Sequence, residues 1–239
     1  GHYYARNQFM ACMCRPGTKN NLNRGIYKSC NTYFSNVYRR IIDKDNKVEE
    51  NINNWHKHLN SFGLGNYLGY DHPVGQPGYV PNANFYNLWY PNQRWRGSTI
   101  VSNAIGQGEI LMTPIQLANV AATIANRGFF YTPHFVKDIQ GDFIDPKYKT
   151  KRATSISKEH FTNVIEGMAD VVSKGTARVA AIRGIEVCGK TGTIENFTKI
   201  DGVRTQLTDH SIFIAFAPKD DPKIALAVIV ENGYWGARW

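Results

Sequence analysis

The sequence is poor in cysteine and lacks long hydrophobic runs. Its 239 residues contain four cysteines, too few for the dense disulfide network of a small secreted scaffold. The longest clean aliphatic run, Ile224 to Val230, is far shorter than the roughly 18 residues that a membrane-spanning helix needs. Internal repeats and low-complexity tracts are also absent. These absences exclude a disulfide scaffold, a repeat array and a membrane span within these residues.

Aromatic and basic residues are plentiful by contrast. Twelve Phe, 13 Tyr and five Trp supply enough apolar surface for a folded core, and the length favours one large domain. The net charge of +9 is spread along the chain and is densest from Lys147 to Arg152. That patch could contact phosphates, but a solvated loop is the favoured interpretation, and we predict no nucleic-acid partner. A mildly basic surface suits an anionic substrate or polymer.

Helical periods dominate the first three quarters of the chain. Apolar spacing predicts helices over about 32–42, 48–59 and 161–172. Thr113-Pro-Ile-Gln116 has the form of a capping box with proline at the first helical position, and predicts a helix to about Asn126. Residues 66–98 show no period and contain four prolines, which is typical of a long functional loop.

The period changes to that of strands after Ile185. A strand is predicted from Ile185 to Thr193, and Ser211 to Ala217 and Ile224 to Val230 are predicted to form a hairpin. Helices followed by a closing meander of strands predict an α/β chain of the α+β type, with helices packed on an antiparallel sheet.

The tetrad Lys190-Thr191-Gly192-Thr193 offers the most chemistry. On an exposed strand it supplies an ammonium, two hydroxyls that suit a carboxylate, and a bare backbone position that a ligand can approach. The Thr193 amide could face a developing oxyanion. Gly184 to Thr191 also matches the spacing of a phosphate-binding P-loop, but its variable residues, Ile-Glu-Val-Cys, read as a strand and no helix pattern follows.

A second polar cluster, Ser29-Cys30-Asn31, precedes the first predicted helix. In isolation it is best interpreted as a turn that caps that helix. Its order relative to three further motifs favours a functional role: Gly106-Gln-Gly108 with Thr113-Pro114, then Gly175-Thr-Ala177, then the Lys190 tetrad.

With these motifs, the chain resembles the transpeptidase domain of class B penicillin-binding proteins, most closely the elongation type called penicillin-binding protein 2. The resemblance runs from about Asn20 to Glu231. Its particular matches are Ser29-Cys-Asn-Thr-Tyr-Phe34, Phe62-Gly63-Leu-Gly65, Gly106 to Leu117, and Gly189-Lys-Thr-Gly-Thr193.

The resemblance implies a penicillin-binding/serine β-lactamase-like transpeptidase fold and a serine acyl-transfer reaction on D-Ala-D-Ala stem peptides in cell-wall synthesis. Ser29 and Lys190 would belong to a proton relay, and Asn31 would bond the substrate. Thr191, Gly192 and Thr193 would bind the substrate's terminal carboxylate region, and the Thr193 amide would serve the oxyanion hole. The resemblance further implies no cofactor, inhibition by β-lactams, and a glycosyltransferase and a shape-determining protein of the elongation machinery as partners.

The chain departs from the family at the nucleophile. The family carries it in a Ser-x-x-Lys motif before Ser-x-Asn, yet residues 1–28 contain no serine. The single Ser-x-x-Lys, Ser155-Ile-Ser-Lys158, follows the wrong motif, and Ser157 there is interpreted as the N-cap of the next helix. We therefore expect residues 1–239 to be a single partial transpeptidase domain, cut at both ends, with a helical part over about 20–176 and strands over about 184–231. Residues 1–239 by themselves should be catalytically incompetent.

The expected location of the whole protein is the extracytoplasmic, periplasmic face of the bacterial inner membrane, with an anchor upstream. Two alternatives stay open: a D,D-carboxypeptidase or β-lactamase-like acylase of the same fold, and a non-catalytic binding or scaffold module. Whether Cys12 and Cys14 bind a metal or merely pack is also open, because a closed zinc site needs four ligands.

Overall fold

The computed structural model describes residues 2–5, 8–10, 12, 17–72, 74–140 and 144–234. Its helices are α1 (Leu22–Tyr27), α2 (Asn31–Ile42), α3 (Val48–Ser61), α4 (Ala83–Trp89), α5 (Pro114–Ala125) and α6 (Phe161–Ser173). Its strands are β1 (His2–Ala5), β2 (Gln8–Met10), β3 (Phe129–Tyr131), β4 (Lys151–Ala153), β5 (Cys188–Ile194), β6 (Phe197–Ile200), β7 (Val203–Gln206), β8 (His210–Ala217) and β9 (Ile224–Val230).

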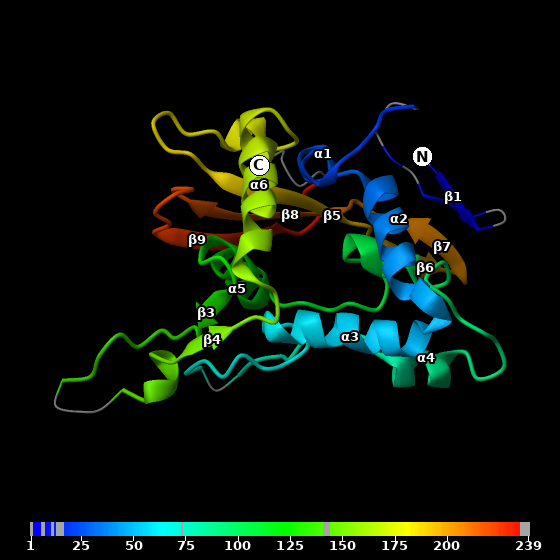
Figure 1. Cartoon of the computed structure of the whole chain (residues 1–239), viewed down its shortest axis with the longest axis horizontal. Coiled ribbons are helices and arrows are strands. Elements are labelled where there is room, and N and C mark those ends of the chain that lie inside the picture. Colours follow the sequence, from blue (N-terminus) through cyan, green and yellow to red (C-terminus); the bar gives the residue numbers. More distant parts are fainter. Residues whose placement is uncertain are drawn as a thin grey trace.

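The main sheet is antiparallel, with strand order β5-β8-β9. Helix α6 crosses over the sheet, and α5 packs beside it against β8 and β9 (Figure 1). The apolar face of α6 is buried with Cys188 of β5 and Phe216 of β8 in the larger of two core clusters. The expected α+β arrangement is therefore confirmed, and β5 is an edge strand of this sheet.

A second core joins the first helices to the segment that follows α4. Ile42 of α2, Ile52 of α3 and Tyr86 of α4 are fully buried in it. At its centre, the Asn103 side-chain amide donates to the hydroxyls of Tyr38 (3.3 Å) and Tyr86 (2.6 Å). These bonds fix the start of the Gly106 to Leu117 segment relative to α2, and so to the Ser29 motif.

Three sequence predictions need correction, and one hairpin was missed. Residues 66–98 are not all loop, because Asn82 caps the seven-residue helix α4, which is too short to show a period. Ser157 is not the N-cap of α6: it precedes a 3-10 turn and makes no side-chain cap bond. The predicted strand does not start at Ile185, which makes only an isolated bridge with Ile182; β5 begins at Cys188. The exposed hairpin of β6 and β7 was not predicted.

The capping box of α5 is confirmed, and its glutamine does more than cap. The Gln116 Oε1 atom accepts from the Thr113 amide at 2.9 Å. Its Nε2 atom donates to the carbonyls of Gly63 (3.2 Å), Asn66 (3.0 Å) and Pro77 (2.8 Å). One buried side chain therefore holds both ends of the 63–77 loop to the helix.

Replacing Gln116 by leucine is expected to lower the free energy of unfolding by about 3 kcal/mol, because buried carbonyls lose their donor. Urea denaturation measures this change. Gln93→Leu, on an exposed loop, is the control and should change stability by less than about 0.5 kcal/mol. A Gln116→Leu variant as stable as the parent would show that water replaces these bonds.

Candidate active site

Ser29 and Lys190 are 161 residues apart in sequence and meet in the fold. The Lys190 Nζ atom donates to Ser29 Oγ at 2.9 Å and to the Thr191 carbonyl oxygen at 2.6 Å. Ser29 lies in the turn between α1 and α2 with φ of 50°, a left-handed conformation that is uncommon for serine. Such strain is often found at functional sites.

The simple capping interpretation of Ser29 is wrong. The N-cap residue of α2 is Cys30, which makes no side-chain cap bond. The Ser29 turn is instead held by backbone bonds, from the Ser29 amide to the Ile26 carbonyl and from the Cys30 amide to the Gly25 carbonyl. The Ser29 hydroxyl is thereby directed to Lys190. Asn31 follows as the first residue of α2.

Burial around its ammonium lowers the pKa of Lys190 from 10.5 to about 8. No carboxylate contributes to this shift; desolvation is its cause. An amine with such a pKa is partly neutral at mildly alkaline pH and can accept a proton as well as donate one. The pair thus has the property that a proton relay requires.

The threonines of β5 lie on the strand face opposite Lys190, because side chains alternate along a strand. The Thr191 hydroxyl is 2.9 Å from that of Thr176, which directly follows Gly175. Thr193 is exposed at the outer end of the strand. A Cβ added at Gly192 would meet only the Ile212 side chain, at 3.4 Å, so packing does not require glycine there. The glycine leaves the strand surface bare for a ligand.

Sequence reasoning noted the Gly175-Thr-Ala177 motif but gave Thr176 no role. Its contact with Thr191 places it in the candidate site, and the motif's position between α6 and β5 is the signal that points to it. The strand structure of residues 188–194 also supports setting the P-loop interpretation aside, because a P-loop leads into a helix.

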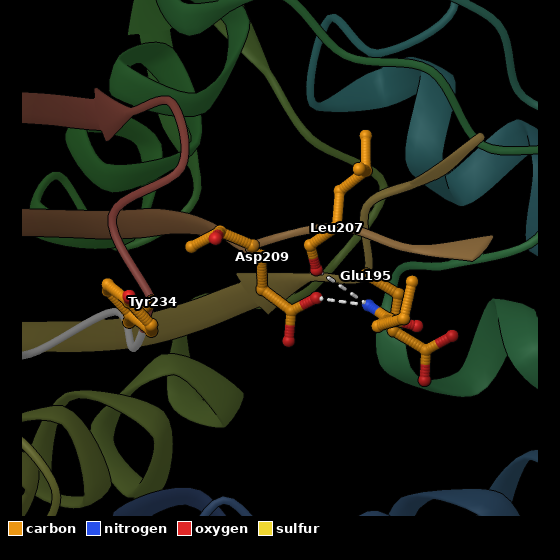
Figure 2. Close-up of a pocket in the computed structure, with 6 residues that line it drawn as sticks. Glu195, Leu207, Asp209 and Tyr234 are labelled. Carbon is orange, nitrogen blue, oxygen red and sulfur yellow. Dashed lines mark hydrogen bonds between the residues drawn. The ribbon is translucent and has the colours of Figure 1, made fainter.

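A cavity of about 610 Å³ opens where β5 ends. Figure 2 shows Glu195 and Asp209 at this cavity, with Leu207 and Tyr234. The Gln206 side-chain amide donates to Asp209 Oδ1 at 2.9 Å, and Glu195 pairs with Arg204 at 3.3 Å. The cavity lies beyond Thr193 and does not include Ser29 or Lys190, so we place the chemistry at the pair and not here.

Within the described ranges, no group of three or more His, Cys, Asp or Glu side chains could hold a metal ion. Cys14 lies outside those ranges. None of the helices described is long and apolar enough to cross a membrane.

The family to which these motifs belong is shown by a match to a known domain family. Residues 6–238 match the profile described as "Penicillin binding protein transpeptidase domain". The chain belongs to this family.

Individual relatives agree with this transpeptidase assignment. The peptidoglycan D,D-transpeptidase MrdA of Acinetobacter baumannii is 32% identical over 90% of the chain. The structure of Pseudomonas aeruginosa PBP2 in complex with WCK 5153 matches with a TM-score of 0.73 at 30% identity, covering 92% of this chain and 44% of that one. Helicobacter pylori PBP2, in its complex with MreC, matches with a TM-score of 0.66 at 30% identity, covering 90% and 37%.

The match is to a part of each relative. The chain spans 32% of the length of the Acinetobacter MrdA protein. The comparisons establish the transpeptidase family and fold.

The lowered pKa of Lys190 predicts a pH-dependent stability. Between about pH 8 and 10.5 the unfolded chain binds more protons at this residue than the folded chain, so its contribution to stability rises with pH. Below pH 8 the cost of the buried ammonium is fully present. Lys190→Met should therefore gain up to about 3 kcal/mol over the parent at pH 7. This gain should shrink towards pH 10.5.

Urea denaturation of parent and variant at several pH values measures the difference. Lys199→Met, at an exposed position of β6, is the control and should show no such trend. A parent–variant difference that does not change with pH would contradict the lowered pKa.

Proposed function

We propose that the whole protein is a serine-type peptidoglycan D,D-transpeptidase. A serine attacks a stem peptide ending in D-Ala-D-Ala, D-Ala leaves, and the amine of a neighbouring stem peptide takes the acyl group. The observation that carries this proposal is the 2.9 Å contact between Ser29 of Ser-x-Asn and Lys190 of Lys-Thr-Gly-Thr. The names of the relatives support it.

Each site residue has a proposed role. Lys190 and Ser29 pass protons between nucleophile and leaving amine, for which the lowered pKa of Lys190 is suited. The Thr191 and Thr193 hydroxyls hold the substrate carboxylate, and Gly192, on the Lys190 face, leaves the backbone of β5 open to the substrate. The Thr193 amide stabilises the oxyanion, and Asn31 bonds the substrate amide. No cofactor takes part.

We propose that the nucleophile comes from a Ser-x-x-Lys segment outside these 239 residues. The chain's one Ser-x-x-Lys sequence begins at Ser155 and lies away from the Ser29 and Lys190 pair. Ser155 Oγ lies 2.6 Å from His58 Nδ1 and 3.0 Å from Ser61 Oγ, at the end of α3. It therefore contacts neither Ser29 nor Lys190. On this proposal, residues 1–239 form one partial transpeptidase domain, with a helical part over about 20–176 and strands over 184–231, that does not react by itself.

The proposed setting follows from the relatives. Helicobacter PBP2 is found in complex with MreC, and we propose an equivalent shape-determining partner here, together with an elongation glycosyltransferase. The protein would work at the periplasmic face of the inner membrane, held by an anchor outside the described residues, and β-lactams would acylate it.

The test is incubation of the purified whole protein with a donor pentapeptide ending in D-Ala-D-Ala and an amine acceptor peptide. Chromatography with mass spectrometry resolves the products. We expect cross-linked peptide and one free D-Ala per cross-link. Free tetrapeptide without cross-links would favour a D,D-carboxypeptidase instead. A protein that binds the donor without releasing D-Ala would favour the scaffold alternative.

A further inference from the structure

The thiol of Cys30 lies against that of Cys12. Their Sγ atoms are 3.4 Å apart, and the Asn20 side-chain amide donates to Cys30 Sγ at 3.4 Å. Cys30 is fully buried, whereas Cys12 is half-buried. Cys30 also lies between Ser29 and Asn31, so a covalent bond at its sulfur constrains the backbone of the Ser-x-Asn motif.

We propose that Cys12 and Cys30 form a disulfide bond that locks the start of α2. A disulfide needs its sulfur atoms about 2.05 Å apart, so the thiols must approach by only about 1.4 Å. Cys30 is the N-cap residue of α2, and the hydrogen bond from its amide to the Gly25 carbonyl oxygen holds the turn in place. The approach is therefore made by Cys12.

The bond would form by thiol–disulfide exchange with a disulfide oxidant, such as glutathione disulfide or an oxidised dithiol protein. The more exposed Cys12 thiolate attacks the oxidant, and one thiol leaves. The Cys30 thiolate then attacks Cys12 Sγ and releases the second thiol. Two protons are lost and two electrons pass to the oxidant. The Asn20 side-chain amide donates to Cys30 Sγ and helps to hold that sulfur in place for the second attack.

The bond would close the loop from residue 12 to residue 30. That loop includes α1, which packs on α6, and it ends next to the Ser29 turn. Closing it limits the freedom of the unfolded chain and fixes Ser29 opposite Lys190 in the folded one. This modification site goes beyond the proposed function and holds whether or not the protein is a transpeptidase.

Cys188 offers an internal contrast. It is fully buried in β5, and its thiol faces the Ile165 carbonyl oxygen at 3.8 Å. Burial raises the pKa of Cys188 to about 12, so its thiolate is not available for exchange. We therefore expect oxidation to act at the Cys12 and Cys30 pair and to leave Cys188 reduced.

The test is oxidation of the purified 239-residue chain with glutathione disulfide, followed by intact mass and peptide mapping without reduction. We expect a loss of two hydrogen atoms per chain, one cross-linked peptide containing Cys12 and Cys30, and a melting temperature raised by on the order of 5 °C. Cys12→Ser and Cys30→Ser should each abolish all three effects. Cys14→Ser is the matched control and should retain them.

The Cys30→Ser variant could lose these effects by misfolding, because Cys30 is fully buried. Cys12 is half-buried, so Cys12→Ser leaves the core intact and tests the disulfide independently of folding. A linkage between Cys12 and Cys14 would overturn the proposal. So would a stable mixed disulfide with glutathione at either residue, or one equivalent of zinc bound to the chain as purified.

Discussion

Replacing Lys190 by alanine in the whole protein is expected to slow acylation by a penicillin by about a thousandfold or more. The variant loses the ammonium that contacts Ser29, and with it the proposed proton relay. Neither Ser29 nor Thr191 can substitute, because neither titrates near neutral pH. The second-order rate of labelling by a fluorescent penicillin measures the effect.

The controls separate chemistry from folding. Lys199→Ala, on β6, should label at the parent rate. Lys190→Arg keeps the charge but cannot give up its proton, so we expect it to remain slow. The parent rate should rise with pH as Lys190 loses its proton near pH 8, and this rise should be absent in the variants. A Lys190→Ala protein within tenfold of the parent would remove Lys190 from the mechanism.

Replacing Gly175 by alanine is expected to destabilise this chain by about 3 kcal/mol. The added Cβ would lie 2.5 Å from the Tyr27 carbonyl oxygen, 2.6 Å from Val171 Cα and 2.9 Å from the Asp170 carbonyl oxygen. All three are backbone atoms and cannot rotate away. Because Tyr27 ends α1 just before Ser29, the required shift also moves the Ser29 turn. Urea denaturation reports the loss of stability.

Gly192→Ala is the matched control for stability. Its Cβ would make an ordinary 3.4 Å contact with Ile212, so the free energy of unfolding should change by less than about 1 kcal/mol. If Gly175→Ala were as stable as Gly192→Ala, the close packing of α1 on the end of α6 would not be a feature of the folded chain.

Local patterns predicted much of the fold because local physics determines them. The apolar spacing of α2, α3 and α6 and the capping box at Thr113 each depend on residues within a few turns. Helix α4 was missed because two turns are too short to show a period. The β6–β7 hairpin was missed because its exposed strands carry no buried face.

The candidate site was less accessible to local reasoning. Taken alone, Ser29 reads as a cap and the Lys190 tetrad as a polar strand. Only the order of motifs, known through the family resemblance, linked them. Their contact depends on how β5 and the turn before α2 are packed, which no local pattern specifies. The lowered pKa of Lys190 has the same origin, because it arises from burial by residues distant in sequence.

Intact mass after exposure to a β-lactam is the most direct test of the transpeptidase function and of the place of its nucleophile. The 239-residue chain and the whole protein are each incubated with a β-lactam and analysed intact. We predict one covalent adduct on the whole protein, at a serine of a Ser-x-x-Lys motif, and none on the 239-residue chain. An adduct on the 239-residue chain would contradict the assignment of the nucleophile. The absence of an adduct from both would contradict the transpeptidase function itself.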